Sequence, residues 1–193
     1  VLRSFHEISS DLEIGLDEKL HRLLRLGCEQ FGLPIAILSR IDGRSFRIQD
    51  AISDSPAFAA GVVKELDQTY CSATVFTNEP VAFEQAGTCL WRDHPSYRDH
   101  GLEAYIGVRV LVDGSLYGTL CFASQAPRRA PFSSTDLETL KLMSQWVGNE
   151  LQRERAEAHM RKLSSALEQT ADTVIITDRE RRIEYVNPAF ERL

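Results

Sequence analysis

The chain carries four cysteines, the side chains most able to act as nucleophiles or redox groups. They are Cys28, Cys71, Cys89 and Cys121, and no two of them form a CxxC pair. Redox catalysis requires a thiolate stabilised by nearby positive charge and a second thiol that resolves the oxidised form. The sequence around Cys71 supplies no basic residue. We therefore expect reduced thiols, with Cys71 as a small buried hydrophobic residue.

Residues 85–100 combine histidines with large aromatic side chains and have no clean periodicity. The four residues are Trp91, His94, Tyr97 and His100. A metal site needs three or four ligands at recognisable spacing, so two histidines predict hydrogen-bonding or surface roles, and we assign no metal site. Long loops with such side chains are more often functional than decorative. The alternative is a well-packed aromatic lid.

Composition and charge limit the classes of function. The chain has 193 residues, of which 43% are hydrophobic and 26% charged, and its net charge is -6. This balance indicates a globular protein, and the negative charge argues against a nucleic-acid partner. Because the sequence has no apolar run near the roughly 20 residues that span a bilayer and no signal peptide, we expect a cytoplasmic protein. It has no phosphate loop and no nucleophile elbow, so we assign no catalytic residue.

Apolar spacing predicts two helices at the start of the chain. The first stripe consists of Val1, Phe5, Ile8 and Leu12. After Gly15, a stronger stripe predicts a helix over residues 16–31. Gly32 and Pro34 should end this helix.

Two pairs of β-branched runs predict antiparallel hairpins. Asp42-Gly43 separates residues 34–41 from 44–52, and Asp113-Gly114 separates residues 105–112 from 115–124. An Asp-Gly pair in this position favours a two-residue type I′ turn.

The second hairpin predicts how the sheet is covered. A two-residue turn places Val110 opposite Tyr117 and Val108 opposite Thr119. Both faces of this hairpin carry large apolar residues. We therefore expect helices to cover one side of the sheet and the middle segment, residues 54–100, to cover the other. Within that segment we expect a helix at residues 58–66, a short helix at 72–76 and a short strand at 81–84.

The spacing from Ser133 onward predicts a helix of about 35 residues. Ser133 and Asp136 resemble a capping box at its start. One face carries Leu137, Leu140, Ser144, Val147 and Leu151. The second face steps 4-3-4-3 through Leu142, Trp146, Asn149, Arg153, Ala156, Met160, Leu163 and Leu167. This heptad register with polar interruptions predicts a dimer helix that shifts between two arrangements, although it also suits an ordinary surface helix.

The order of these elements resembles the GAF domain over about residues 16–155. The segments that carry the resemblance are Tyr70-Cys71-Ser72-Ala73-Thr74, Asn78-Glu79-Pro80-Val81, Tyr105-Ile106-Gly107-Val108-Arg109-Val110, Tyr117-Gly118-Thr119-Leu120 and Phe132-Ser133-Ser134-Thr135-Asp136. The resemblance implies an α+β fold, with an antiparallel sheet sandwiched between helices and a long C-terminal helix. We accordingly place a GAF sensor domain with its N-terminal helix at residues 1–155 and a signalling linker helix at residues 134–168.

The tail resembles the opening of a PAS domain. The matching segments are Val174-Ile175-Ile176-Thr177-Asp178 and Ile183-Glu184-Tyr185-Val186-Asn187-Pro188-Ala189-Phe190. Arg181 stands where that family usually has Gly, so a positive φ there would cost about 1 kcal/mol. We place an incomplete PAS domain with a partial β-hairpin at residues 169–193.

Some activities of GAF relatives match this sequence poorly. Members that bind cyclic nucleotides share an Asn-Lys pair, a Phe and an Asp-Glu pair. This chain has Phe132 and Asp136, but Ser124-Gln125 replaces Asn-Lys and Leu137 replaces Glu. The resemblance therefore argues against nucleotide binding.

Two cysteine-dependent activities remain open as alternatives. In bilin photoreceptors the attachment Cys would fall near residues 92–93, and Cys89 lies three residues away without an adjacent His. In free methionine sulfoxide reductases a reactive Cys lies where Cys71 does, but Ser72 replaces the usual Gly and the other cysteines do not match. A GAF enzyme or chromophore site would therefore use Cys71 or Cys89.

The resemblance implies a sensory module that binds a small ligand of unknown identity, with no cofactor assigned. Its candidate ligand-binding residues are Cys71, Phe83, Trp91, His94, Tyr97, His100 and Cys121. The linker helix would form a homodimer and relay the signal to the PAS domain and an output domain, a histidine kinase or a cyclic-di-GMP diguanylate cyclase or phosphodiesterase. Since the chain opens at Val1 and stops inside an element, we expect a piece of a longer bacterial protein. The alternative is a ligand-free dimerisation block.

Overall fold

The computed structural model describes residue 8 and residues 14–191. The chain divides into two compact units, residues 1–151 and residues 152–193, and each is considered by itself. Val1, Phe5 and Leu12, from the first predicted helix, lie outside the described residues. Within the described part of the chain, no helix has both the length and the apolar character needed to cross a bilayer.

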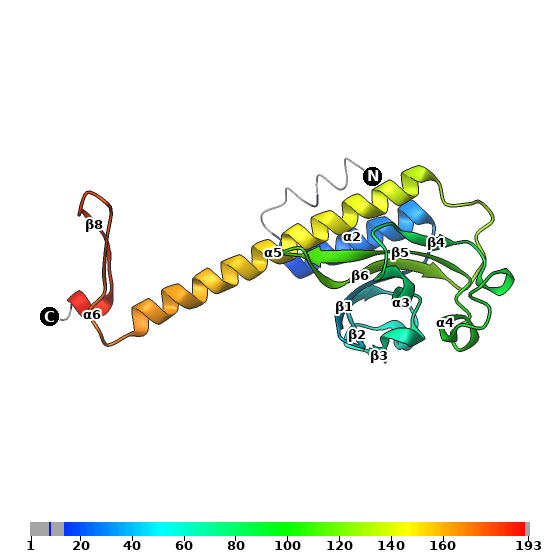
Figure 1. The fold of residues 1–193 in the computed structure, drawn as a ribbon, viewed down its shortest axis with the longest axis horizontal. Coiled ribbons are helices and arrows are strands. Elements are labelled where there is room, and N and C mark those ends of the chain that lie inside the picture. Colours follow the sequence, from blue (N-terminus) through cyan, green and yellow to red (C-terminus); the bar gives the residue numbers. More distant parts are fainter. Residues whose placement is uncertain (1–7, 9–13, 192–193) are drawn as a thin grey trace. The chain divides into compact units, whose positions relative to one another are not determined.

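Six strands from the described part of the first unit form one antiparallel sheet (Figure 1). Their order is β3-β2-β1-β6-β5-β4. The strands are β1 (Ile35–Asp42), β2 (Ser45–Ile52), β3 (Val63–Glu65), β4 (Val81–Phe83), β5 (Ala104–Val112) and β6 (Ser115–Ser124). Both predicted hairpins are present as β1–β2 and β5–β6, and the fold is α+β as predicted.

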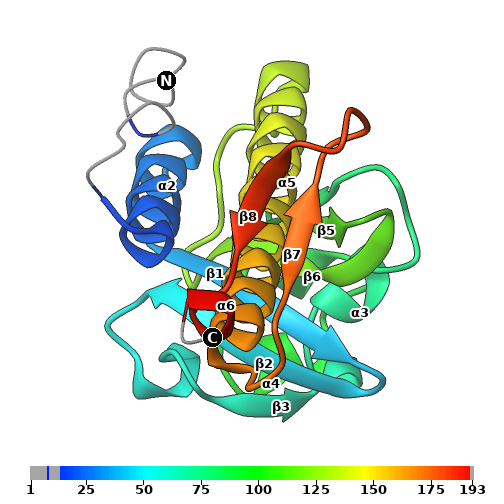
Figure 2. The same cartoon turned by 90° about the vertical axis from the view of Figure 1, so that its left-hand side faces the viewer.

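Helix α2 (Leu16–Phe31) follows the predicted stripe and packs on β1 and β2. It ends at Gly32, whose φ of 64° is the left-handed conformation that glycine adopts without strain, and the Gly32 N–H donates to the Cys28 carbonyl. Figure 2 shows α2 beside helix α5 (Ser134–Gln169). At Gly27 in α2, an added Cβ would lie 2.2 Å from the Phe122 ring, so this helix lies directly against β6.

The sheet has an apolar core on each face, as the sequence predicts. On one face, α2 and α5 bury residues that include Leu23, Phe31, Val108, Phe122 and Leu140. The irregular segment between β2 and β5 covers the other face and buries a second core, whose members are Ile35, Ile37, Phe46, Ile48, Phe58, Tyr70, Cys71, Phe83, Ala86, Leu102, Tyr105, Cys121 and Ala123. Burying such side chains stabilises a domain by about 1.5–3 kcal/mol each.

The turn of the β5–β6 hairpin is the predicted one, but the predicted register is wrong beyond it. Asp113 and Gly114 both have positive φ, 52° and 72°, as a type I′ turn requires. A bulge between Val110 and Leu111 then shifts the pairing, so Val110 lies opposite Gly118 instead of Tyr117. Because β6 has one extra residue at the bulge, every pair farther from the turn is shifted by one position relative to the predicted register.

The turn of the β1–β2 hairpin is one residue later than predicted. Asp42 pairs with Ser45, so Gly43 and Arg44 are the central residues. Of these two, only Gly43 has a positive φ, 58°. A positive φ at the first central position alone is typical of a type II′ turn.

The predicted helix at residues 58–66 is wrong. Residues 56–68 instead form a 3₁₀ turn at Pro56–Phe58, the edge strand β3 and a 3₁₀ turn at Leu66–Gln68. Gly61 has a φ of 89°, which a right-handed helix cannot contain, and β3 satisfies its backbone groups by pairing with β2. Beyond it lie helix α3 (Cys71–Thr74), strand β4, a 3₁₀ turn at Ala86–Thr88 and helix α4 (Pro95–Arg98), so the short helix and short strand that we predicted are present with small shifts.

Helix α5 has the predicted length and start. The Ser133 N–H donates to Asp136 Oδ2 at 2.9 Å and the Asp136 N–H donates to Ser133 Oγ at 3.1 Å, which is the reciprocal pattern of a capping box. Leu140 and Val147 are buried against the sheet. At Gly148 an added Cβ would lie 2.2 Å from the Leu111 carbonyl oxygen, so α5 approaches the backbone of β5 closely.

The heptad stripe of α5 is only partly covered in the single chain. Leu142, Met160 and Leu163 are 52%, 65% and 48% exposed. Asn149 and Arg153 are exposed, whereas Trp146 is half-buried and packs against the core between the helices and the sheet. One position of the heptad stripe, Trp146, therefore belongs to the core of the first unit.

The second unit contains the end of α5, the antiparallel pair β7 (Ile175–Thr177) and β8 (Ile183–Val186), and helix α6 (Pro188–Glu191). Asn187 is fully buried and caps α6. Its Oδ1 accepts from the Val174 N–H at 2.9 Å, and its Nδ2 donates to the Leu167 and Asp172 carbonyls. Arg181 has a φ of 64°, the positive value expected at that position.

Candidate ligand-binding site

An aromatic cluster lies on the sheet face opposite α2 and α5, and Tyr70 is at its centre. The Tyr70 ring meets Phe83 at 4.9 Å, Trp91 at 5.5 Å and His94 at 4.8 Å between centroids. Phe83 and Trp91 are stacked at 5.4 Å. Phe83, Trp91 and His94, which are predicted site residues, therefore meet around Tyr70, which was not predicted.

Tyr70 is fixed by its hydroxyl as well as by its ring. The hydroxyl donates to the Leu102 carbonyl at 2.8 Å. Burial raises the pKa of the Tyr70 phenol well above its ordinary value, so the group is neutral and remains a donor. Tyr70 precedes Cys71 in the sequence. A large aromatic residue next to a candidate cysteine is a signal that could have identified it.

Cys71 and Cys121, fifty residues apart, lie side by side in the core behind this cluster. Their Sγ atoms are 3.7 Å apart. The Tyr105 hydroxyl donates to Cys71 Sγ at 3.5 Å and forms a 2.7 Å hydrogen bond with Thr74 Oγ1. The pair therefore belongs to a buried polar chain that joins α3 to the neighbouring strands β5 and β6.

In this environment the two thiols have different pKa values. The pKa of Cys71 is lowered to about 7, chiefly by the hydrogen bond from the Cys121 thiol, against the opposing effect of burial. Nearby hydroxyl groups, including that of Tyr105, lower this pKa further. The pKa of Cys121 is raised well above its ordinary value by its hydrogen bond to Cys71 and by burial. The first proton therefore leaves Cys71.

Gly107 makes the position of Tyr105 possible. Both residues point to the same face of β5, and an added Cβ at Gly107 would lie 2.1 Å from the Tyr105 hydroxyl oxygen. The absence of a side chain at Gly107 thus lets the tyrosine lie back along its own strand and reach Cys71.

The two histidines of the site make hydrogen bonds of different kinds. His94 Nδ1 accepts from the Ser96 N–H at 3.1 Å and caps α4. His100 Nε2 lies 2.8 Å from Lys64 Nζ, and the His100 ring meets Phe58 at 5.1 Å. Burial lowers the pKa of both histidines and of Lys64, so the imidazoles are neutral at pH 7.

A cavity of about 40 Å³ lies between this face of the sheet and the irregular segment. Its walls include Cys71, Cys121, His100, Lys64 and the exposed Gln68. A water-sized molecule needs about 10–15 Å³ of such volume, so the cavity has room for about three. Drug-sized ligands occupy roughly 300–1,000 Å³, so one of that size would require side chains to move.

Of the predicted residues, Cys71, His100 and Cys121 line this cavity, whereas Phe83, Trp91, His94 and Tyr97 lie outside its lining. Phe83, Trp91 and His94 form the aromatic cluster, and Tyr97 is half-buried against the same core with its hydroxyl over Gly87. Cys89 is half-buried and its thiol donates to the Ala86 carbonyl at 3.6 Å.

Two larger hollows lie on the opposite, helix-covered side of the sheet. One, of about 360 Å³, is lined by residues that include His21, Asp50 and Tyr117, and the other, of about 670 Å³, by residues that include Arg109 and Lys141. Both walls contain exposed charged side chains. We take the smaller cavity as the site because it combines aromatic walls, the neutral His100 imidazole and a thiol pair. In the described residues, no three His, Cys, Asp or Glu side chains are arranged to hold a metal ion.

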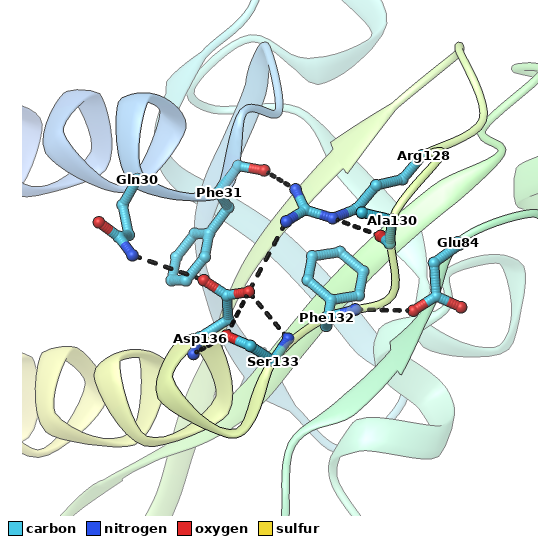
Figure 3. A network of polar contacts seen from close by, with 8 residues as sticks. All are labelled: Gln30, Phe31, Glu84, Arg128, Ala130, Phe132, Ser133 and Asp136. Carbon is cyan, nitrogen blue, oxygen red and sulfur yellow. Dashed lines mark hydrogen bonds and ion pairs between the residues drawn. The ribbon is translucent and has the colours of Figure 1, made fainter.

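A polar network joins the edge of the site to the start of α5 (Figure 3). Glu84, next to Phe83, accepts from the Phe132 N–H at 3.0 Å through its carboxylate and from the Arg128 N–H at 2.9 Å through its carbonyl. The Arg128 guanidinium lies 3.6 Å from the Asp136 carboxylate.

The same network holds the end of α2. The Arg128 guanidinium also donates to the Phe31 carbonyl, and Gln30 Nε2 donates to Asp136 Oδ1 at 3.4 Å. Three parts of the chain that are far apart in the sequence, the end of α2, the residue after β4 and the start of α5, therefore meet at one cluster of charged and amide groups (Figure 3).

Comparison with known families agrees with this architecture. The family model described as GAF domain matches residues 15–151. The chain belongs to the GAF family. A model described as PAS domain matches residues 161–193. No curated protein sequence matches the chain significantly.

Solved structures share the fold of this GAF domain at low sequence identity. One is the GAF domain of an Acinetobacter phosphoenolpyruvate-protein phosphotransferase, with 16% identity, a TM-score of 0.66, and 80% of this chain and 92% of that chain covered. Another is a domain of a Sinorhizobium meliloti 1021 protein described as a two-component sensor histidine kinase, with 18% identity, a TM-score of 0.60, and 76% and 98% covered. A third is the free methionine-R-sulfoxide reductase of Neisseria meningitidis with its substrate, with 16% identity, a TM-score of 0.63, and 80% and 89% covered. At these identities the likeness establishes the fold.

Proposed function

We propose that this GAF domain is the sensory module of a bacterial signal-transduction protein. A small ligand would bind at the cavity beside Cys71, and α5 would carry the response toward the PAS segment. The observation that carries the proposal is the connection from the aromatic cluster through Phe83, Glu84 and Arg128 to Asp136 in the first turn of α5.

The site favours a compact ligand with an apolar body and one polar group. Aromatic rings form its deep wall, and Lys64 and His100 supply donors at the outer wall. Because the cavity measures only about 40 Å³, a ligand larger than a few water molecules would displace a ring of the cluster. Trp91 and His94 are half-buried and lie on the segment between β4 and β5, so they are the side chains that we expect to move.

Movement of the cluster would reach α5 through Glu84. Phe83 stacks on Trp91, and the next residue, Glu84, holds the Phe132 N–H and the Arg128 N–H. Arg128 in turn pairs with Asp136 in the first turn of α5. A ligand can shift α5 only if it binds its two arrangements with different affinity, so the coupling requires two states of this network.

We propose that a second copy of the chain covers the exposed stripe of α5. Leu142, Met160 and Leu163 recur at heptad spacing and are about half exposed or more. Polar residues at Asn149 and Arg153 would fix the register of a parallel homodimer at some cost in stability. The proposed dimer residues of α5 are Leu142, Trp146, Asn149, Arg153, Ala156, Met160, Leu163 and Leu167.

The output would lie beyond the PAS segment. We propose a histidine kinase or a cyclic-di-GMP diguanylate cyclase or phosphodiesterase in a cytoplasmic protein, with no catalysis by the GAF domain itself. The structural likeness to a domain of a sensor histidine kinase supports this assignment.

The small cavity favours one second candidate, a ligand-free dimerisation block. Tyr70, Phe83, Tyr105 and the two cysteines already fill most of the space between sheet and segment. In that case α5 would hold the dimer and the site would be an ordinary core.

A ligand screen separates the two candidates. The thermal midpoint of the purified chain would be measured with a library of small polar aromatic and aliphatic compounds, and the Trp146→Phe variant would leave Trp91 as the single tryptophan reporter at the site. We expect a compound that raises the midpoint and quenches Trp91, and a His100→Ala variant that weakens its binding at least about ten-fold, equivalent to 1.4 kcal/mol. As a control, His159→Ala on the exposed part of α5 should leave binding unchanged. No stabilising compound, or equal binding in both variants, would favour the ligand-free block.

A further inference from the structure

Cys71 and Cys121 are placed for a bond that they do not form in this structure. Their Sγ atoms are 3.7 Å apart, whereas a disulfide requires about 2.05 Å. Closing the gap would take a movement of about 1.7 Å. Cys71 begins the four-residue helix α3, while Cys121 lies in the centre of the sheet, so the movement falls on the short helix.

The two thiols are chemically unequal, as an attacking and a resolving cysteine must be. With its pKa at about 7, Cys71 is about half ionised at neutral pH, against roughly 1% for a thiol at the ordinary value of 9.0. The lower basicity makes each thiolate less nucleophilic, so the net gain in rate is about six-fold. Cys121 keeps its proton and donates it toward the Cys71 sulfur.

A small oxidant has space beside the pair. Both cysteines line the cavity of about 40 Å³, which has room for a molecule the size of hydrogen peroxide. The cavity wall extends to the exposed Gln68. The buried polar chain of Tyr105 and Thr74 supplies a hydroxyl donor directly at Cys71 Sγ.

We propose that Cys71 and Cys121 form a thiol switch, which small hydroperoxides oxidise to an intramolecular disulfide and small dithiols reduce again. The switch is a modification site of the domain. It does not depend on the ligand proposed above.

The oxidation proceeds in two balanced steps. The Cys71 thiolate attacks one peroxide oxygen, an S–O bond forms as the O–O bond breaks, and the leaving hydroxide takes a proton to become water. Cys121 then loses its thiol proton and attacks the Cys71 sulfur, the S–S bond forms as the S–O bond breaks, and a second water leaves. The two thiols lose two electrons in total, and the peroxide gains them.

The disulfide would tie α3 to β6 across the cavity wall. Cys71 would lose its contact with the Tyr105 hydroxyl, because a disulfide sulfur is a weak acceptor and must turn toward Cys121. Oxidation would therefore change the shape of the candidate site whether or not a ligand binds there.

The test uses two double variants of the whole chain, each with two of the four cysteines. The Cys28→Ser/Cys89→Ser protein keeps the pair, and the Cys71→Ser/Cys121→Ser protein keeps only the half-buried cysteines. Both would be exposed to hydrogen peroxide at pH 7 and then denatured for thiol counting and mass spectrometry. We expect the first to lose both thiols and about 2 Da, with full recovery after dithiothreitol, and the second to react at least about five-fold more slowly.

Single variants assign the order of attack. Cys121→Ser should stop at a sulfenic acid on Cys71 that dimedone traps, and Cys71→Ser should prevent the reaction. Cys71→Ala serves as a second variant if circular dichroism shows that the serine protein does not fold. The proposal is overturned if the two double variants react at equal rates, if peptide mapping finds a disulfide to Cys28 or Cys89 in the unmodified protein, or if Cys71 accumulates sulfinic acid without a disulfide.

Discussion

At the scale of single residues, the site depends on Tyr105 and on the glycine beneath it. The tyrosine hydroxyl connects Thr74 to Cys71, and Gly107 leaves room for it along the strand. The pKa of the tyrosine itself is raised well above its ordinary value, chiefly by burial, so it donates throughout the physiological range.

The ionisation of Cys71 gives a pH dependence that can be measured. Thiolates absorb ultraviolet light more strongly than thiols, so in the Cys28→Ser/Cys89→Ser variant the thiolate absorbance of Cys71 should rise with pH and reach half its plateau at about pH 7 while Cys121 keeps its proton. The Cys71→Ser/Cys89→Ser/Cys121→Ser variant provides the control, because burial raises the pKa of Cys28 to about 11 and its thiolate absorbance should still be rising at pH 9. A variant without cysteines would supply the baseline at each pH.

Tyr105→Phe tests the cause of this behaviour. The variant keeps the ring but removes a hydroxyl that lowers the pKa of Cys71, so the Cys71 profile should move to higher pH while that of Cys28 stays in place. A Cys71 profile centred at 9 in the protein that keeps Tyr105 would contradict the proposed environment.

The sequence analysis predicted candidate residues that share one core, including Cys71, Phe83 and Cys121, but not their chemistry. It gave no reason for Cys71 to ionise because only basic neighbours along the chain were considered. The groups that lower the pKa are a thiol and hydroxyls, and Cys121 comes from a strand fifty residues away. Such proximity depends on the packing of α3 against β6, which local patterns do not contain.

At the scale of elements, the start of α5 is connected to the end of α2 and to Arg128 through one carboxylate. Asp136 completes the capping box, faces Arg128 and accepts from Gln30. The Asp136 carboxylate therefore caps the N-terminus of α5 and links it to the end of α2.

Asp136→Ala should destabilise the GAF domain by about 1–2 kcal/mol, because it removes the cap and leaves the partly buried Arg128 without this carboxylate. Urea unfolding followed by circular dichroism would measure the change. Glu138→Ala is the matched control: Glu138 lies in the same turn, is largely exposed and pairs with Lys141, so its loss should cost less than about 0.5 kcal/mol. Equal effects of the two variants would show that the network does not hold the helix.

Arg181→Gly should stabilise the β7–β8 hairpin of the second unit by about 1 kcal/mol. Arg181 has a φ of 64°, which is strained for a residue with a Cβ and unstrained for glycine. Hydrogen exchange of the amide at Ile176 would report the local stability of the hairpin. Arg179→Gly is the control, since residue 179 is not at a positive φ, and there the same substitution should give no gain.

The elements that the sequence predicted well are those with strong local signals. Helices α2 and α5 follow apolar stripes with a glycine stop or a capping box, and the Asp113-Gly114 turn has the predicted backbone. The residue 58–66 helix was wrong because an edge pairing with β2 and the positive φ of Gly61 outweighed the apolar spacing. The register of β5–β6 failed because a bulge adds one residue, and nothing in the alternation of Tyr117 and its neighbours marks it.

At the scale of the whole molecule, the proposed dimer makes a prediction about mass. The chain of 21.8 kDa should elute as a particle of twice that mass in size-exclusion chromatography with light scattering. Met160→Glu/Leu163→Glu places charges in the exposed stripe and should give a monomer, because like charges would face each other across the seam. Lys162→Glu, on another face of α5, should remain dimeric. A monomeric unmodified chain at high concentration would exclude this stripe as a dimer interface.

The central claim is that events at the site reach α5, and the two tryptophans report its two ends separately. Trp91→Phe leaves Trp146 on α5 as the only tryptophan, while Trp146→Phe leaves Trp91 at the site. With a compound identified by thermal shift, we predict that the emission of both tryptophans changes at the same concentration. Adding Glu84→Ala should abolish the response of Trp146 and preserve that of Trp91, whereas Glu79→Ala, which removes only an exposed ion pair with Lys141, should preserve both. A saturated response at Trp91 with none at Trp146 in the protein that retains Glu84 would contradict the relay.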